Sequence, residues 1–260
     1  MVYKGKYKII DNLITACDYD FLLKKIDESI SKKSSLLISP IASHTLVRAH
    51  YDKELKKILD RFDYLVPDSQ WVRWSIPFLY GKGKNLEGRV YGPELMLRIC
   101  RIAEHKKHKV FFYGNTKTVL KKLKNQIKIL FPKLKTVGYE QSKFRGLTKN
   151  EEDYISTTIR NNQANIVFVS LGSPRQEVFS FDLSEQLKRP LIIIPVGAAF
   201  DFISKNKPQA SDFIKSIGFE WFFRFITEPG RLLFRYFIYG TLYIFLILYQ
   251  KLTLKFRLQY

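Results

Sequence analysis

One aspartate stands directly after a short apolar run, where a carboxylate could act as a general base. Asp68 follows residues 64–66, which are typical of a β-strand, and precedes Ser69 and Gln70. A carboxylate within hydrogen-bond reach of a sugar hydroxyl can accept its proton during group transfer. An ordinary turn or helix-capping aspartate fits the same position. The position alone leaves both interpretations open.

A second polar group follows the most apolar run of the chain. Residues 172–177 read Gly-Ser-Pro-Arg-Gln-Glu. Pro174 suits the first position of a helix and Glu177 suits its first turn, which predicts a well-capped helix start. A more specific hypothesis is that Gln176 points into the crevice at the strand end and binds hydroxyl groups of a donor or an acceptor.

Other predicted strands also end in turns with Gly or Pro that lead into helices. Backbone amides at such turns favour phosphate groups, and open α/β sheets bind ligands beyond the carboxyl ends of their strands. We therefore expect phosphate or nucleotide contacts at these turns. The residues concerned are Ser39, Gly114, Gly172, Gly197 and Ala198. The sequence contains no GxGxxG and no GxxxxGK[ST], so neither a standard dinucleotide site nor a P-loop is supported.

The sequence offers no convincing metal site. Asp18 and Asp20 form a DxD pattern, which binds a metal–nucleotide complex in many glycosyltransferases, but they precede a helical run, so helix capping explains them better. Cys17 and Cys100 lie far apart, and the four histidines form no ligand pattern with them. We expect chemistry without a metal or another cofactor.

Three arginines near the end of the chain, Arg224, Arg231 and Arg235, are spaced seven and four residues apart. On one continuous helix they would share a face, although Pro229 and Gly230 are expected to break that helix. They form either a solvated or lipid-facing basic stripe or a clamp for a diphosphate.

The net charge of +20 implies an anionic partner: nucleic acid, an anionic membrane or phosphorylated substrates. Residues 204–260 carry nine Lys/Arg against three acidic residues and hold an aromatic-rich apolar run of 13 residues, 237–249. Basic residues around such a run indicate binding at a membrane surface. No run of 18 apolar residues occurs, so we expect no spanning helix. The sequence thus predicts a cytoplasmic protein, peripheral on the inner face of the cytoplasmic membrane.

Strand-like runs alternate with helical patterns along most of the chain. The runs lie near residues 36–39, 64–66, 109–113, 136–139, 165–171 and 191–196, and the helical patterns near 43–60, 92–106, 116–130, 148–161 and 174–187. This alternation predicts a Rossmann-like α/β fold, with a mostly parallel sheet and helices on both faces. We expect a catalytic core over residues 1–203 and a helical, membrane-associating appendage over residues 204–260.

The motifs in this order resemble the WecG/TagA/CpsF glycosyltransferases, which make bacterial surface polymers. The resemblance covers nearly the whole chain. It rests on residues 39–40, 66–68, 88–95, 111–114, 171–177, 196–202 and 218–231. It implies inverting transfer of a sugar from a UDP-sugar to an undecaprenyl-diphosphate-linked acceptor, on a Rossmann-like core with an appendage at the membrane.

The resemblance also implies roles for single residues. Asp68 matches the proposed catalytic base. The residues that match substrate-binding positions are Ser39, Arg89, Gln176 and Asp201, and the arginines at 224, 231 and 235 match those proposed to receive the lipid diphosphate.

The chain departs from the family pattern at three places. Ile41 stands where the family has an asparagine, Ser69 replaces a frequent glycine, and residues 209–211 read Gln-Ala-Ser where Arg-Ala-Pro is common. An isoleucine cannot replace the hydrogen bonds of an amide. These changes bear on the identity of the sugar.

Two other functions are compatible with parts of the sequence. The charge alone would suit a basic nucleic-acid-binding α/β protein, but aromatic residues in RNA-binding proteins are more often scattered among polar ones, so we expect no nucleic acid. The missing pocket amide would suit a non-catalytic scaffold of a polysaccharide-assembly complex. The sequence is compatible with a homo-oligomer and leaves the oligomeric state open.

Overall fold

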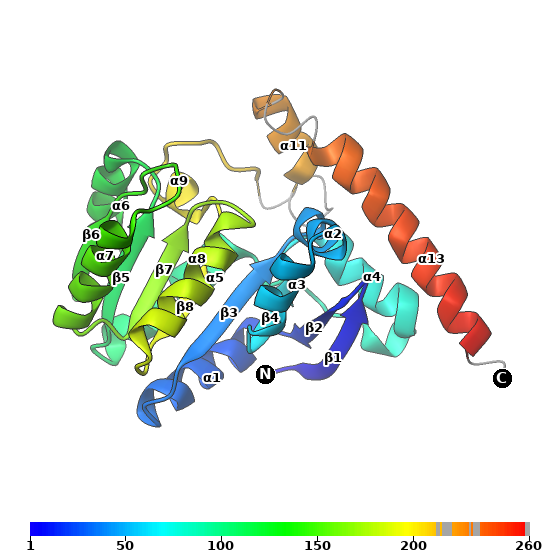
Figure 1. The fold of residues 1–260 in the computed structure, drawn as a ribbon, viewed down its shortest axis with the longest axis horizontal. Helices are drawn as coiled ribbons and strands as arrows, with labels where there is room; N and C mark the ends of the chain where they lie inside the picture. The colour runs from blue at the N-terminus through cyan, green and yellow to red at the C-terminus, as the bar shows by residue number, and fades with distance from the viewer. Residues whose placement is uncertain (212–213, 215–219, 229, 231–234, 258–260) are drawn as a thin grey trace.

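The computed structural model describes residues 1–211, 214, 220–228, 230 and 235–257. Eight strands form one sheet in the order β1-β2-β4-β3-β8-β7-β5-β6. β1 runs antiparallel to β2, and every other neighbouring pair is parallel (Figure 1). The strands are β1 Tyr3–Ile9, β2 Asn12–Cys17, β3 Leu36–Ile41, β4 Tyr64–Pro67, β5 Lys109–Gly114, β6 Lys135–Glu140, β7 Ile166–Ser170 and β8 Ile192–Pro195.

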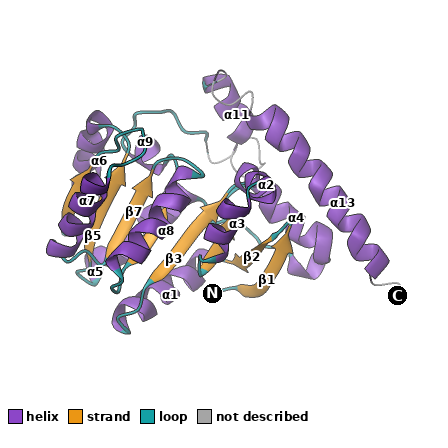
Figure 2. Cartoon of the chain, viewed as in Figure 1, coloured by secondary structure: helices purple, strands orange, loops and turns teal. Residues whose placement is uncertain are grey.

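Helices cover both faces of the sheet (Figure 2). One apolar cluster holds side chains of α2, α3, α4, α7, α8 and α13, and the other holds side chains of α1, α5, α6 and α9. The helices are α1 Tyr19–Ser31, α2 Ser43–Tyr51, α3 Lys53–Asp60, α4 Gln70–Tyr80, η1 Lys82–Lys84, α5 Gly92–His105, α6 Lys117–Leu130, α7 Lys149–Asn161, α8 Arg175–Leu187, α9 Ala199–Ile203, α11 Glu220–Thr227, the π-helical η2 Arg235–Gly240 and α13 Thr241–Arg257. The predicted fold class is confirmed.

The central strands are apolar on both sides, as strands between two helical layers must be. Every residue of β3, β7 and β8 is buried, and these strands follow the predicted runs closely. Their carboxyl ends lie at one edge of the sheet, because neighbouring strands from β2 to β6 are parallel. The loops at this edge carry most of the residues selected from the sequence.

Four features differ from the sequence prediction. The hairpin of β1 and β2 and the helix α4 were not predicted. The single helix expected near 43–60 is two helices, because Asp52 leaves the helical conformation and caps α3 with its side chain. Pro174 is the N-cap of α8 and not its first helical residue.

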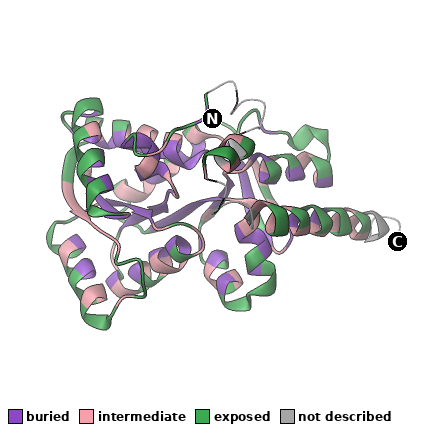
Figure 3. Cartoon of the chain, turned by 90° about the horizontal axis from the view of Figure 1, so that it is seen from above, coloured by how far each residue is buried: buried purple, intermediate pink, exposed green. Residues whose placement is uncertain are grey.

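The C-terminal helix α13 packs against the core through one side only (Figure 3). Tyr243 and Ile247 are buried in the cluster that also holds α2 and α4, whereas much of the opposite side is exposed. The predicted boundary between residues 203 and 204 falls at the end of α9. The division into a core and an appendage stays a prediction.

Candidate functional site

Asp68 lies where β4 ends and faces the start of α5. Its Oδ1 accepts a hydrogen bond from the backbone N–H of Gly92 at 2.9 Å, and its own N–H donates to the carbonyl of Ile41 at 3.1 Å. Ser69, and not Asp68, caps α4 through a bond from the N–H of Val72. An N–H at a helix N-terminus attracts a negatively charged group, and a carboxylate can serve as a general base.

The guanidinium of Arg89 lies beside this aspartate, and that of Arg73 lies near Arg89. Nη1 of Arg89 donates to the carbonyl of Asp68 at 3.0 Å, and the guanidinium lies 4.5 Å from the ring centre of Tyr91. Arg73, on α4, donates to Gln70 and to the carbonyl of Leu86. Burial lowers the pKa of Arg73, and the positive charge of Arg89 lowers it further. Paired cations of this kind suit an anionic substrate group.

Arg73 was not among the residues predicted from the sequence. Its position could have pointed to a role in the site, because it lies five residues after Asp68 on the following helix. That signal was hidden because residues 70–80 were not recognised as helical.

A buried carboxyl group joins the ends of β3 and β7 to α2. Glu177 is fully buried, and its Oε1 accepts from Oγ of Ser39 at 3.2 Å and from Nε2 of Gln176 at 3.1 Å. Its Oε2 accepts from Oγ of Ser173 at 2.7 Å, and Ser173 in turn accepts from Thr45 of α2 at 2.9 Å. Burial raises the pKa of Glu177, and these hydrogen bonds lower it by less. Its place in the first turn of the helix is confirmed, but its buried network was not predicted.

Gln176 is buried and connects α8 to the loop after β8. Its Oε1 accepts from the N–H of Gly197 at 3.0 Å, while its Nε2 donates to Glu177. Both ends of the amide are therefore engaged within the protein. Direct binding of substrate hydroxyls by Gln176 stays a prediction, and its contacts suit a residue that holds two strand-end loops together.

The loops after β5, β7 and β8 meet in a second cluster. Gly114 has a φ of 120°, and a Cβ on it would lie 2.3 Å from the carbonyl oxygen of Ser170, so only glycine fits. Ser170 donates to the carbonyl of Gly197 at 2.6 Å. Nδ2 of Asn115 donates to Asp201 at 2.8 Å. Gly197 and Ala198 directly precede α9, whose first turn holds Asp201.

The aspartate and the loop cluster are close neighbours. A Cβ on Gly92 would lie 3.0 Å from the carbonyl oxygen of Val196, so α5 begins against the end of β8. The structure thus brings together Asp68, Arg89, Ser39, Gln176, Gly197, Gly114, Ala198 and Asp201 along the ends of five strands. Gly172, with a φ of 75°, lies in the loop that leads to α8.

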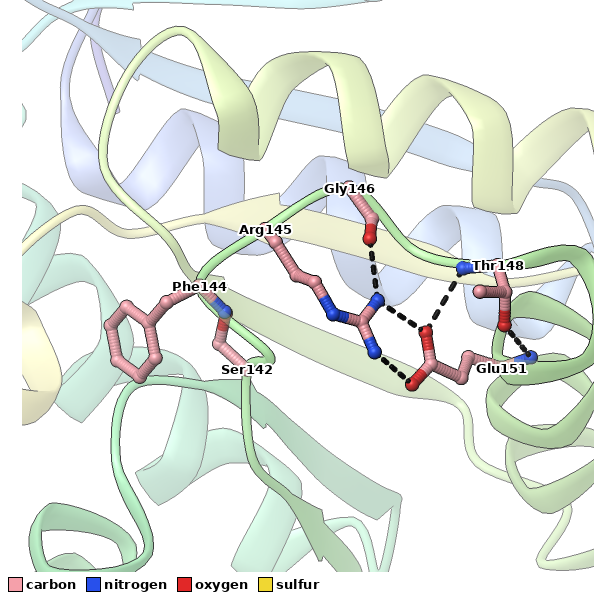
Figure 4. A network of polar contacts seen from close by, with 6 residues as sticks. All are labelled: Ser142, Phe144, Arg145, Gly146, Thr148 and Glu151. Carbon is pink, nitrogen blue, oxygen red and sulfur yellow. Dashed lines mark hydrogen bonds and ion pairs between the residues drawn. The ribbon is translucent and has the colours of Figure 1, made fainter.

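The loop between β6 and α7 borders this edge (Figure 4). Ser142 donates through its N–H to the carbonyl of Asn115, which ties the loop to the end of β5. Arg145 makes two bonds of 2.8 Å to the carboxylate of Glu151, and Thr148 and Glu151 form a capping box at the start of α7. The bonds from Arg145 lower the pKa of Glu151 to about 2. This loop was not selected from the sequence.

The three arginines of the appendage are only partly described. Arg231 lies outside the described residues. Arg224 lies in α11 and Arg235 in the separate η2 segment, but their side chains also lie outside what is described. α11 ends at Thr227, and the break predicted at Pro229 lies outside the described residues. An ion pair of 2.8 Å between Lys207 and Glu228 ties the end of α11 to the segment after α9.

Among the residues that the structure describes, no group of three or more His, Cys, Asp or Glu could hold a metal ion. Asp18 caps α1 by accepting from the N–H of Phe21 at 2.9 Å, as the sequence predicted. Both cysteines are buried, and burial raises the pKa of Cys17 to about 12. The expectation of chemistry without a metal stays a prediction.

One helix is longer than the apolar run of the sequence indicated, and the expectation of no spanning helix stays a prediction. A continuous helix over Tyr236–Leu254 has 19 residues and a mean hydropathy of 1.4, which by length and composition would be enough to cross a bilayer. This helix is longer than the apolar run of 13 residues at 237–249, because helical residues on either side of the run extend the apolar segment.

The fold and the site define a Rossmann-like α/β protein that gathers a carboxylate, two guanidinium groups and glycine-rich turns at the carboxyl edge of its sheet. The chain belongs to the glycosyl transferase WecG/TagA/CpsF family, whose model matches residues 7–257. The resemblance found in the motifs is confirmed.

Two curated relatives carry the same name, N-acetylglucosaminyldiphosphoundecaprenol N-acetyl-beta-D-mannosaminyltransferase. The one from Bacillus spizizenii is 30% identical over 174 residues, which are 67% of this chain and 64% of the relative. The one from Bacillus subtilis strain 168 is 26% identical over 220 residues, which are 85% of this chain and 80% of the relative. The first match therefore spans slightly less than two thirds of that relative.

Proposed function

We propose that this chain transfers a sugar, with inversion, from a UDP-sugar to an acceptor sugar linked to undecaprenyl diphosphate, in the synthesis of a surface polysaccharide. The observation that carries the proposal is Asp68, held by the N–H of Gly92 beside Arg89 at the carboxyl edge of the sheet. The names of the two relatives, which specify a diphosphoundecaprenol acceptor and a mannosaminyl group, support it.

In the proposed reaction, Asp68 accepts the proton of the acceptor hydroxyl while that oxygen attacks the anomeric carbon of the donor. The bond from the anomeric carbon to the UDP oxygen breaks, and UDP leaves with that electron pair. Arg89, Arg73 and the N–H groups of the strand-end turns are suited to stabilise the diphosphate that leaves. Asp201 and Asn115 lie among those turns and are suited to bind the nucleoside part of the donor.

We further propose that the reaction requires no metal. Metal-dependent transferases use a cation to offset the charge of the leaving diphosphate. In the described part of this chain, arginine and backbone N–H groups near the site could do the same. The three arginines at 224, 231 and 235 would receive the diphosphate of the acceptor, and the protein would work on the inner face of the cytoplasmic membrane.

A peripheral position is favoured over a spanning one by the contacts of α13. Gln250 accepts from the N–H of Ile10 at 2.8 Å and donates to the carbonyl of Lys8 at 2.7 Å. Nζ of Lys251 donates to the carbonyl of Leu79 at 3.1 Å. A helix bound along the core in this way would lie in the membrane interface with its apolar outer side toward lipid. Release by high salt or carbonate is expected, and resistance to both would contradict this position.

The direct test is incubation with a panel of UDP-sugars and synthetic lipid-diphosphate acceptors, with UDP release as the readout. UDP release that requires both substrates supports the proposal. If no donor and acceptor pair releases UDP while the folded protein binds the acceptor, a non-catalytic scaffold replaces it.

A further inference from the structure

One face of α4 is apolar and exposed although α4 belongs to the core. Trp71, Trp74 and Phe78 follow one another at positions i, i+3 and i+7, so they share one side of the helix. They are 40%, 42% and 46% exposed. The two indole rings contact each other edge to face, with centroids 5.9 Å apart. Three adjoining aromatic side chains on one surface indicate an interaction site and not scattered exposure.

The other side of α4 already has its packing partners. Val72, Ile76 and Leu79 are buried in the same apolar cluster as α2 and α3. This eleven-residue helix therefore carries apolar residues on two of its sides. A helix at the surface of a soluble domain needs only one apolar side. The three aromatic residues are not required by the core.

The exposed face of α4 adjoins the exposed face of α13. Hydroxyl groups of Ser75 and Tyr243 are hydrogen-bonded at 2.8 Å, and the ammonium of Lys251 lies 5.5 Å from the ring centre of Phe78. Ile244 and Leu248, which are exposed, share one side of α13 with Lys251, at positions i, i+4 and i+7. The side of α13 that contacts α4 thus carries further apolar residues.

The charged residues in the two segments that carry these faces are all of one sign. Residues 70–85 and 235–257 together contain seven basic residues and no acidic one. A second copy of this chain would bring the same basic segments against each other across a two-fold axis, which is unfavourable. An anionic membrane complements them, and tryptophan is the residue that favours the boundary between headgroups and acyl chains.

We propose that α4 is a second lipid-contacting element, and that Trp71, Trp74 and Phe78 enter the headgroup region of an anionic membrane beside α13. The proposal rests on the proposed function, because a lipid-linked acceptor requires the site to approach a membrane. Since α4 begins two residues after Asp68, this contact would bring the proposed base to the lipid surface.

The test uses tryptophan fluorescence, because the chain has only three tryptophans. In the full-length double variant Trp71→Phe/Trp221→Phe, Trp74 is the one remaining reporter. Vesicles of phosphatidylcholine and phosphatidylglycerol, brominated near the headgroup, should shift its emission to the blue and quench it. The control places a reporter on α7 by Tyr154→Trp, with all three native tryptophans replaced by phenylalanine, and should show neither effect.

A second measurement removes the aromatic side chains. The double variant Trp74→Ser/Phe78→Ser should bind these vesicles at least about tenfold more weakly, because about half of two large apolar side chains no longer transfers into lipid. The control Tyr154→Ser removes an aromatic residue of α7 that is even more exposed, at 60%, and should bind like the unmodified chain.

Pelleting of the unmodified chain with the vesicles separates the possible failures. If the chain pellets but Trp74 is not quenched, α4 does not contact lipid, and the membrane association proposed above stands. If the chain does not pellet, both fail, and UDP release with a water-soluble acceptor analogue still tests the reaction. A blue shift that depends on protein concentration and not on lipid would assign the surface to a second copy and overturn the proposal.

Discussion

Replacing Glu177 tests whether its buried network holds the site together. The carboxylate accepts from Ser39, Ser173 and Gln176, which come from the ends of two strands and from α8. In Glu177→Ala, Ser173 can turn toward Thr45, but the hydroxyl of Ser39 and the amide of Gln176 lose their acceptor. An unsatisfied buried donor costs about 1–3 kcal/mol. We expect a loss of about 3 kcal/mol in the free energy of unfolding.

The variant Glu177→Gln separates shape from charge. It keeps the volume and one carbonyl acceptor, and it removes the cost of burying an ionised group. Because burial raises the pKa of Glu177 in the folded state, the carboxyl stabilises the fold fully below its unfolded pKa. That contribution is lost as the pH rises through the folded pKa. Glu177→Gln should therefore unfold with a weaker pH dependence in this range than the unmodified chain.

Urea unfolding between pH 4 and pH 8, followed by fluorescence, measures both effects. A change of about 3 kcal/mol corresponds to a fall in Tm of roughly 6–12 °C for a domain of this size. Sugar transfer should fall in the alanine variant and recover in part in the glutamine variant. The reasoning is refuted if the alanine variant stays within about 1 kcal/mol of the unmodified chain, or if glutamine is as damaging as alanine.

Three further outcomes follow from the site and from α13. Activity should be unchanged in excess EDTA, and a strict requirement for magnesium or manganese would contradict the metal-free reaction. Tyr243→Phe should lower the free energy of unfolding by about 1 kcal/mol and speed amide hydrogen exchange in α13, because the hydrogen bond to Ser75 is lost. Unchanged exchange would show that this hydrogen bond does not hold α13 against the core. Gly114→Ala should lower the free energy of unfolding by at least about 3 kcal/mol, measured with denaturant, since its Cβ would meet the carbonyl of Ser170. The control Gly83→Ala should be neutral, because a Cβ there meets nothing within 4 Å. Equal stability of these two variants would exclude the clash.

The central strands could be predicted from the sequence because they are apolar on both sides. Continuous apolar runs in the sequence mark β3, β5, β7 and β8. Once these strands were predicted, the turns at their ends could be located as well. β1 could not, because Lys4, Lys6 and Lys8 make its sequence resemble a basic loop, and only pairing with β2 shows it to be an edge strand. α4 was hidden by Pro77, which usually argues against a helix interior.

The site was predictable where a residue's role depends on its own strand end. Asp68 stands directly after a strand, and its position alone attracted attention, whereas Asp201 was selected through the family resemblance. Glu177 has a partner, Ser39, that lies 138 residues away in the sequence, so local pattern suggested only a helix-end acid. Arg73 was likewise hard to predict, because its role depends on Arg89 nearby. Arg89 lies in a loop, and hydrophobic periodicity does not predict where a loop residue is placed.

The most direct test of the account is the rate of sugar transfer by Asp68→Asn, measured with the donor and acceptor pair that the unmodified chain uses. The asparagine keeps an oxygen for the N–H of Gly92, so the fold and donor binding should be unchanged. Loss of the general base should lower kcat by about 10²–10⁴-fold. A variant that folds, binds donor and keeps more than about a tenth of the rate would contradict the assignment of Asp68 as the base.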